Sequence, residues 1–243
     1  MARRSRQKGL IGNGAGGKAG GKRRLLAEEV AHAIVDRAAR GIFKPGQRLI
    51  ETEVAQELGV SRLPLREALK ALESQGIVHS TPHRGTRLMD VTESRFQKLM
   101  DIRMALETFA LQRAIPNYKA NPRRLSKLDR VIRDMEKAAE REDRYRMAEC
   151  DVQFHRELCL AADNEVLVQM WSGLSRQLLI AFGDPVLGNP DINQYMVEHK
   201  GLRDAIARGD LAAAEKALHH HIVVGWRLPA GSSGAARARP KDT

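Results

Sequence analysis

The chain has 243 residues, of which 42% are hydrophobic, and this is enough for one large domain or two small ones. No apolar run approaches the roughly 18 residues that a membrane span requires, and we expect no secretory signal, because no apolar segment follows the basic N-terminus. Two cysteines, Cys150 and Cys159, argue against a disulfide framework, so we expect a cytoplasmic protein. The few Phe, Tyr and Trp side chains argue against a stacking platform for single-stranded nucleic acid.

The formal charge of +11 lies mainly at the two ends of the chain. Residues 1–24 hold eight basic side chains and no acid, and residues 229–243 add a net charge of +2. A basic tail attracts polyanions without sequence preference, but a tail that only solubilises a protein has a similar composition. The charge alone therefore does not assign a nucleic-acid partner.

Composition divides the chain into four parts. The stretch Gly9–Gly21 is so rich in glycine that it cannot offset its ordering entropy, and we predict a disordered basic arm over residues 1–23. The tail over residues 229–243, rich in Gly, Ser and Ala, is predicted to be disordered as well. Between them we predict a mixed N-terminal domain over residues 24–90 and an all-helical domain over residues 91–228.

Apolar periodicity and turn residues predict the elements of the N-terminal domain. Gly41 is suited to end the first helix, and Ser61 is suited to cap the third, with Pro64 tolerated in its first turn. The expected elements are a helix over residues 25–41, a turn at 44–47, a short helix over 51–58, a helix over 61–76, and a hairpin of strands 77–80 and 86–89.

This order of elements is that of a winged helix-turn-helix, in which a short helix braces a second helix that fits the roughly 12 Å wide major groove. The second helix presents four polar side chains opposite its leucine stripe: Ser61, Arg62, Arg66 and Lys70. The two arginines share a face, and arginine can meet guanine or phosphate bidentately. At the hairpin tip, His83 and Arg84 beside Gly85 could reach the DNA backbone or the minor groove. The alternative is a solvated basic face on a structural bundle.

Three runs in this domain resemble GntR-type bacterial repressors. They are GIFKPGQRL at residues 41–49, LGVSRLPLREAL at residues 58–69, and HRG at residues 83–85. The resemblance implies that Arg62 and Arg66 are the principal contacts to operator DNA, supported by Ser61, Thr52 and the wing. Two positions depart from the family and bear on the operator sequence, namely Leu63, where a small or hydroxylated residue is usual, and Thr52, where a larger polar residue is usual.

The rest of the chain, after Asp90, has a helical pattern as far as Trp226. The first helix is expected to end at Pro116, and Asn121 with Pro122 to begin the second. The remaining helices are expected over residues 143–162, over 164–182, from Asn189-Pro190 onward, and from Asp210 onward. The fold class is therefore mainly α, with an N-terminal winged helix-turn-helix and a C-terminal all-helical antiparallel bundle.

Helical angles of about 100° per residue place four metal-ligating side chains on the inward faces of three helices. Asp151 and His155 lie within the apolar stripe of one helix, and His199 lies within that of another. The last helix carries three consecutive histidines, of which the middle one points outward. We select His221 rather than His219, because alanines on its flank leave room for the ring.

A buried unpaired carboxylate costs several kcal/mol or shifts its pKa, and a divalent cation between Asp151 and the three imidazoles would lower that cost. The donor set suits Zn²⁺, Ni²⁺ or Mn²⁺. The alternative is that each histidine is a core residue hydrogen-bonded to backbone.

A second alternative is a metal-dependent, hydrolase-like enzyme whose basic module binds nucleic acid non-specifically. Such an enzyme needs a general base, and periodicity places no spare Glu, Ser or Lys inward. Fusion to a DNA-reading module favours sensing over turnover, so we expect no enzyme activity.

The helical half resembles the effector domain of the FadR-type subfamily of GntR regulators, the FCD domain. The similar residues are DVQFH at 151–155, EH at 198–199 and HI at 221–222. The resemblance implies that the four inward residues bind a metal beneath an effector pocket. It makes Arg103 a candidate to bind the carboxylate of an acidic effector, although an ordinary helix-surface arginine is the alternative, and Arg176 is a further candidate.

Together the two halves predict a ligand-responsive transcriptional regulator, which we expect to be a repressor that works as a homodimer. Two recognition helices about 34 Å apart would read a short, near-palindromic operator in double-stranded DNA. A small organic acid or sugar acid near the metal would act through its differential affinity for two arrangements of the domains.

Overall fold

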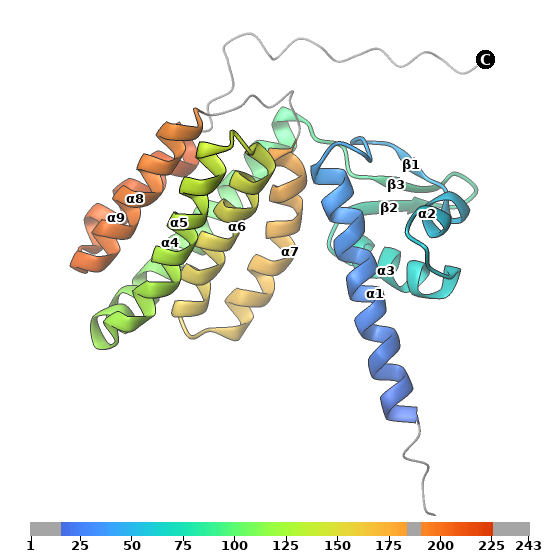
Figure 1. Cartoon of the computed structure of the whole chain (residues 1–243), viewed down its shortest axis with the longest axis horizontal. Helices are drawn as coiled ribbons and strands as arrows, with labels where there is room; N and C mark the ends of the chain where they lie inside the picture. Colours follow the sequence, from blue (N-terminus) through green and yellow to red (C-terminus); the bar gives the residue numbers. More distant parts are fainter. Residues whose placement is uncertain (1–15, 184–190, 226–243) are drawn as a thin grey trace, which may run out of the picture.

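The computed structural model describes residues 16–183 and 191–225 of the chain. In this part, a small N-terminal module with a three-stranded sheet is followed by a helical bundle (Figure 1). Helix α7 (Glu165–Phe182) of the bundle packs against α1 (Gly16–Ala39) of the N-terminal module. The predicted fold class is confirmed.

The N-terminal module has the element order of a winged helix-turn-helix. Its further elements are β1 (Arg48–Leu49), α2 (Glu51–Glu57), α3 (Arg62–Ser74), β2 (Val78–Thr81) and β3 (Gly85–Leu88). The strands form an antiparallel sheet in the order β1-β3-β2. Sequence analysis missed β1, because two residues carry no periodicity and become a strand only by pairing with β3.

The leucine stripe of α3 is buried, as its periodicity predicted. Leu65 and Leu72 of α3 and Ile34 of α1 have no exposed surface, and α1 packs along α3. Burial of each such side chain contributes about 1.5–3 kcal/mol, and this fixes the polar face of α3 outward. Gly76, with a left-handed φ of 67°, lets the chain turn away at the end of the helix.

The bundle consists of helices joined by short turns. In chain order these are α4 (Glu93–Ala120), the 3-10 turn η1 (Pro122–Arg124), α5 (Leu125–Glu140), α6 (Arg144–Ala161), α7, α8 (Ile192–Arg208), α9 (Leu211–His219) and the π-helical turn η3 (His220–Val224). Asp143, Asn164 and Asp210 cap α6, α7 and α9 by accepting backbone N–H groups, and these helices begin where the sequence predicted. None of the described helices is long and apolar enough to cross a membrane.

Helix α4 does not end at Pro116, as the sequence predicted, but continues to Ala120. Proline lacks the N–H group of a helix interior and is unfavourable there. However, Ile115 and Tyr118 on either side are buried in the core, and their packing outweighs the local cost. Pro122 begins the 3-10 turn η1, which runs directly into α5 at Leu125, so the next helical segment begins where the sequence predicted.

The helix α1 also begins earlier than predicted. Residues 16–23, which we had assigned to the disordered arm, form its first turns. Once the later turns of α1 are packed, each further residue adds one hydrogen bond without a new nucleation cost, so the helix extends. Three predicted features lie outside the described residues: the arm over residues 1–15, the tail over residues 229–243, and the helix start at Asn189-Pro190. Helix α8 begins after Asp191, which caps it.

Candidate functional site

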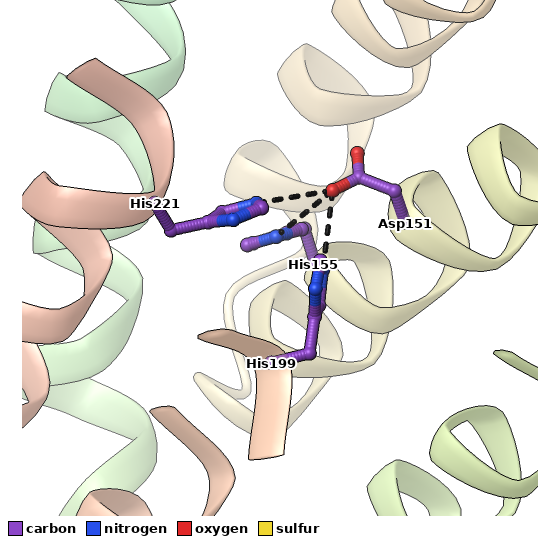
Figure 2. A group of neighbouring side chains, drawn as sticks. All are labelled: Asp151, His155, His199 and His221. Carbon is purple, nitrogen blue, oxygen red and sulfur yellow. Dashed lines mark hydrogen bonds and ion pairs between the residues drawn. The ribbon is translucent and has the colours of Figure 1, made fainter. Parts of the chain in front are cut away.

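Four metal-ligating side chains meet inside the bundle, and we call them the Asp/His cluster. Asp151 and His155 lie one turn apart on α6, His199 comes from α8, and His221 comes from η3 (Figure 2). All four are fully buried, and one ligand atom from each lies within 4.8 Å of the others. The structure therefore brings together the four residues that helical angles selected.

The cluster is centred on one carboxylate oxygen. Oδ1 of Asp151 lies 3.4 Å from Nε2 of His155, 3.2 Å from Nε2 of His199 and 3.1 Å from Nε2 of His221. The other oxygen, Oδ2, is buried and has no hydrogen-bond partner among the described residues. Three ring nitrogens thus converge on a single acceptor atom.

Each ring is oriented by an acceptor behind its other nitrogen. The Tyr195 carbonyl oxygen lies 2.8 Å from Nδ1 of His199, and Oε2 of Glu198 lies 3.1 Å from Nδ1 of His221. Oε2 of Glu107 forms an ion pair with Nδ1 of His155. An acceptor at Nδ1 keeps a proton there and leaves the lone pair on Nε2 in the neutral ring. Metal-binding histidines are commonly held in this way.

Burial and charge set the protonation of the cluster. Burial lowers the pKa of His199 to about 4, so this ring is neutral near pH 7. Burial acts to raise the pKa of Asp151, but the charge of Arg103 holds it well below its usual value. Burial likewise acts to lower the pKa of His221, but hydrogen bonds to Asp151 and Glu198 outweigh it and raise that pKa. The neutral His199 therefore turns a lone pair toward an ionised carboxylate.

Arg103 lies against the cluster and is fully buried, so it is not the helix-surface arginine of the alternative interpretation. Its Nη2 atom lies 3.1 Å from Oδ1 of Asp151, and its Nε atom donates to Oε1 of Glu107 at 2.8 Å. Nη1 of Arg103 and the indole Nε1 of Trp171 are buried without a hydrogen-bond partner in the described part of the chain. The guanidinium carbon lies 6.0 Å from the centre of the Trp171 ring, so these two side chains are neighbours.

Arg176, the other predicted effector contact, is not part of this site. It lies where α7 meets the N-terminal module, and there its Nη1 atom donates to Oε1 of Gln75 at 3.0 Å and its Nη2 atom pairs with Glu28. Arg176 therefore contacts the N-terminal module, and its role as an effector contact remains a prediction. A helical pattern separates faces of α7, but it does not reveal which neighbour each face contacts.

Two carboxylates beside the cluster were given no role from the sequence. Sequence analysis found no spare inward glutamate, yet Glu107 of α4 is fully buried and Glu198 of α8 lies behind His221. The available signal for Glu107 was its position one turn after Arg103, where an ion pair can form along the helix. Glu198 belongs to the EH pair that resembles the FCD domain, but no spacing rule placed it behind His221, because only the fold brings it next to the last helix.

The predicted DNA-contacting residues lie on the surface of the N-terminal module. All eight are exposed: Thr52, Ser61, Arg62, Arg66, Lys70, His83, Arg84 and Gly85. Ser61 occupies the N-cap position of α3, but its side chain accepts no capping hydrogen bond. Arg66 pairs with Glu51, whose Oε2 atom lies 2.7 Å from the arginine Nε. Leu63 exposes 53% of its surface at the start of α3, so the recognition surface includes an apolar side chain there.

The wing tip depends on left-handed backbone. His83 has a φ of 62° and Gly85 a φ of 77°. A Cβ atom at Gly85 would lie 3.0 Å from Nε of Arg48, so glycine also lets this arginine approach the wing.

Both modules match known protein families. Residues 26–88 match the bacterial regulatory proteins of the gntR family, and residues 98–223 match the FCD domain. Among solved structures, E. coli McbR/YncC has a TM-score of 0.69 at 24% identity over 81% of this chain and 93% of that chain. At this identity, the structural match shows a shared fold.

Two curated relatives extend this comparison. The protein named "Probable D-xylose utilization operon transcriptional repressor" from Paenarthrobacter nicotinovorans is 31% identical over 218 residues, which are 89% of this chain and 94% of the relative. The gluconate operon transcriptional repressor of Bacillus subtilis (strain 168) is 32% identical over 146 residues, which are 60% of this chain and 58% of the relative. The chain therefore belongs to the GntR family of bacterial regulatory proteins, and it is a ligand-responsive, DNA-binding transcriptional regulator with an FCD domain.

Proposed function

We propose that the chain is a cytoplasmic repressor that binds its operator as a homodimer, and that an organic acid beside a divalent metal ion modulates its operator affinity. The observation that carries this proposal is the convergence of three imidazole Nε2 atoms on one carboxylate oxygen, in a chain that also holds a DNA-binding module. The relatives described above are named as operon repressors, which supports repression rather than activation.

The chemistry of the donor set supports the metal. Nε2 of neutral His199 and Oδ1 of Asp151 both carry lone pairs and lie 3.2 Å apart, a repulsive contact unless a proton or a cation lies between them. Imidazole nitrogens with one carboxylate oxygen suit Zn²⁺, Ni²⁺ or Mn²⁺. When bound, the metal would act as a Lewis acid toward an anionic ligand.

The unsatisfied donors beside the cluster support an acidic effector. A buried donor without an acceptor costs about 1–3 kcal/mol, and Arg103 and Trp171 each have one. A carboxylate can accept from both, and a charge-assisted bond to a guanidinium is among the stronger hydrogen bonds. One of the two relatives is named for a gluconate operon, and gluconate is a sugar acid, which supports a sugar acid within this class.

The recognition surface supports operator binding by α3 and the wing. Arg62, Arg66 and Lys70 lie at successive i, i+4 positions of α3 and are exposed. We assign Arg62 and Arg66 to direct DNA contact, with the other six exposed residues in support: Thr52, Ser61, Lys70, His83, Arg84 and Gly85. A dimer would place two such surfaces about 34 Å apart on the DNA.

An exposed apolar surface, which we call the α4/α7 patch, supports the homodimer. It consists of Ile102 and Phe109 on α4 and Val166 and Met170 on α7, which expose between 38% and 57% of their surface. Helices α4 and α7 pack together, and Phe109 lines a hollow with Glu165 at the start of α7. Apolar side chains gathered on adjacent helices are typical of protein contact surfaces.

The hydrolase-like alternative gains no support from the two glutamates beside the cluster. A general base must be free to take a proton near the metal position. Glu107 already contacts Arg103 and His155, and Glu198 contacts His221. Both carboxylates therefore orient neighbouring groups instead.

DNase I footprinting upstream of the protein's own gene tests the proposal. Metal-loaded protein is expected to protect one short, near-palindromic site, and the protection is expected to change when carboxylic or sugar acids are added. Uniform protection along the fragment, or protection that no acid alters, would contradict the proposal.

A further inference from the structure

Side chains of the bundle close the C-terminal end of the recognition helix α3. A helix leaves its last carbonyl groups without partners inside the helix. Here the carbonyl oxygen of Gln75, the C-cap residue, accepts from Nε2 of Gln177, and that of Gly76 accepts from Nη2 of Arg95, each at 2.8 Å. Both bonds are partly buried, which limits competition from water.

Three bundle residues make this contact, and we call them the α3 latch: Arg95 on α4, and Arg176 and Gln177 on α7. Nη2 of Arg95 also donates to Oε1 of Gln177 at 2.8 Å, which joins α4 to α7. Arg176 adds the contacts to Gln75 and Glu28 described above. The latch therefore joins two bundle helices to both α3 and α1.

The same two helices line the Asp/His cluster. Arg95 and Arg103 lie about two turns apart on α4, and Gln177 and Trp171 lie under two turns apart on α7. Arg103 is bonded to the cluster, and the Trp171 ring centre lies 6.2 Å from that of His155. Helices α4 and α7 therefore connect the cluster to the latch, and a packed helix can transmit a displacement along its length.

We propose that the α3 latch positions the recognition helix and transmits to it the structural effect of a ligand bound at the Asp/His cluster. This deepens the proposed function and rests on it, since it assigns the route by which the bound metal and acid alter operator affinity. The latch residues act as positioning residues. A ligand shifts an equilibrium only through its differential affinity for two arrangements, and the latch is the element in which those arrangements differ.

Hydrogen–deuterium exchange of the full chain tests the latch without DNA. In the double variant Arg95→Ala/Gln177→Ala, amide exchange at the end of α3 is expected to rise about tenfold, as the loss of two hydrogen bonds implies. The control is Tyr145→Phe, which removes the 2.5 Å bond from the Tyr145 hydroxyl to Asp36 of α1 and leaves α3 untouched. It is expected to keep wild-type exchange at α3.

Two further variants show whether protection at α3 is lost because the latch is broken or because the protein misfolds. Arg95→Lys can retain one hydrogen bond and is expected to restore most of the protection. Gln177→Ala alone removes the bond to Gln75 and serves if thermal unfolding shows that the double variant does not fold. Unchanged exchange at α3 in a folded latch variant would overturn the proposal.

The transmission is tested by adding Zn²⁺ alone, as the ligand of the Asp/His cluster. Saturating Zn²⁺ is expected to slow exchange at the end of α3 about fivefold or more in the wild type, and to have no effect there in the double variant, although both take up the metal. An equal response in both proteins, or no response of metal-loaded wild type, would overturn the transmission. If elemental analysis finds no uptake at all, the metal part of the proposed function fails, and exchange without metal still decides whether the latch positions α3.

Discussion

Two carboxylates, Asp151 and Glu107, are fully buried at the site. Burial acts to raise their pKa values, but the neighbouring charges of Arg103 and His155 hold both pKa values down. Both carboxylates therefore depend on buried positive charge, in an interior where an unpaired charge is costly. A divalent cation beside them would add positive charge, which would favour an anionic effector.

Removal of two imidazoles tests the metal assignment. The double variant His155→Ala/His199→Ala is expected to purify without bound metal, because two of the three nitrogen donors are lost. Elemental analysis of the purified protein measures this. The control His32→Ala/His219→Ala changes two exposed histidines and is expected to retain the metal. Full retention in the first variant would show that the ligands lie elsewhere.

Arg66 tests the recognition surface. Arg66→Ala is expected to weaken operator binding about ten- to hundredfold in a mobility-shift assay at fixed salt, since a bidentate arginine contributes that much discrimination. Its side chain is exposed and pairs with Glu51, so the fold is expected to survive its removal. The control Arg133→Ala on α5 removes an equally exposed charge from the bundle. Equal operator binding by both variants would show that Arg66 does not contact the DNA.

The ends of helices determine where the functional side chains lie. Gly209, with a φ of 68°, ends α8, and Asp210 caps α9 at once by accepting from the N–H of Ala213 at 3.0 Å. Helix α9 then passes into the π-helical turn η3, which carries His221. Such turns are frequent at functional sites, because one wider turn changes the direction of the following side chains.

The cap of α9 gives a stability prediction. Asp210→Ala is expected to lower the free energy of unfolding by about 1 kcal/mol, because the N–H of Ala213 loses its acceptor. Urea denaturation measures the change. Asp210→Ser keeps a capping oxygen and is expected to remain close to wild type, and an equal loss in both variants would assign the effect to something other than capping.

The two modules make one connected molecule. A Cβ atom on Gly183, just after α7, would lie 1.9 Å from the carbonyl oxygen of Ala39 at the end of α1, so the backbones are in close contact there. The α3 latch adds polar contacts along the same boundary. The bundle therefore has both a close backbone contact with α1 and hydrogen bonds to the recognition helix.

Assembly is tested at the α4/α7 patch. The double variant Ile102→Asp/Met170→Asp is expected to be a monomer by sedimentation or light scattering, because charges would be buried without partners in the dimer contact. The control Val197→Asp changes a side chain on α8 that is 58% exposed and is expected to leave the dimer intact. A dimer that persists in the patch variant would place the interface elsewhere.

Periodicity and capping residues were sufficient to predict the winged helix-turn-helix, most bundle helices and all four members of the Asp/His cluster. These features follow from local rules, since a helix buries one stripe and Asp151 and His155 share it by spacing alone. The contacts behind the cluster, the place of Arg176, the strand β1 and the passage of α4 through Pro116 depended on packing between distant segments. Helical spacing indicates which face is buried, but the neighbour that covers this face is set by the fit of the whole chain.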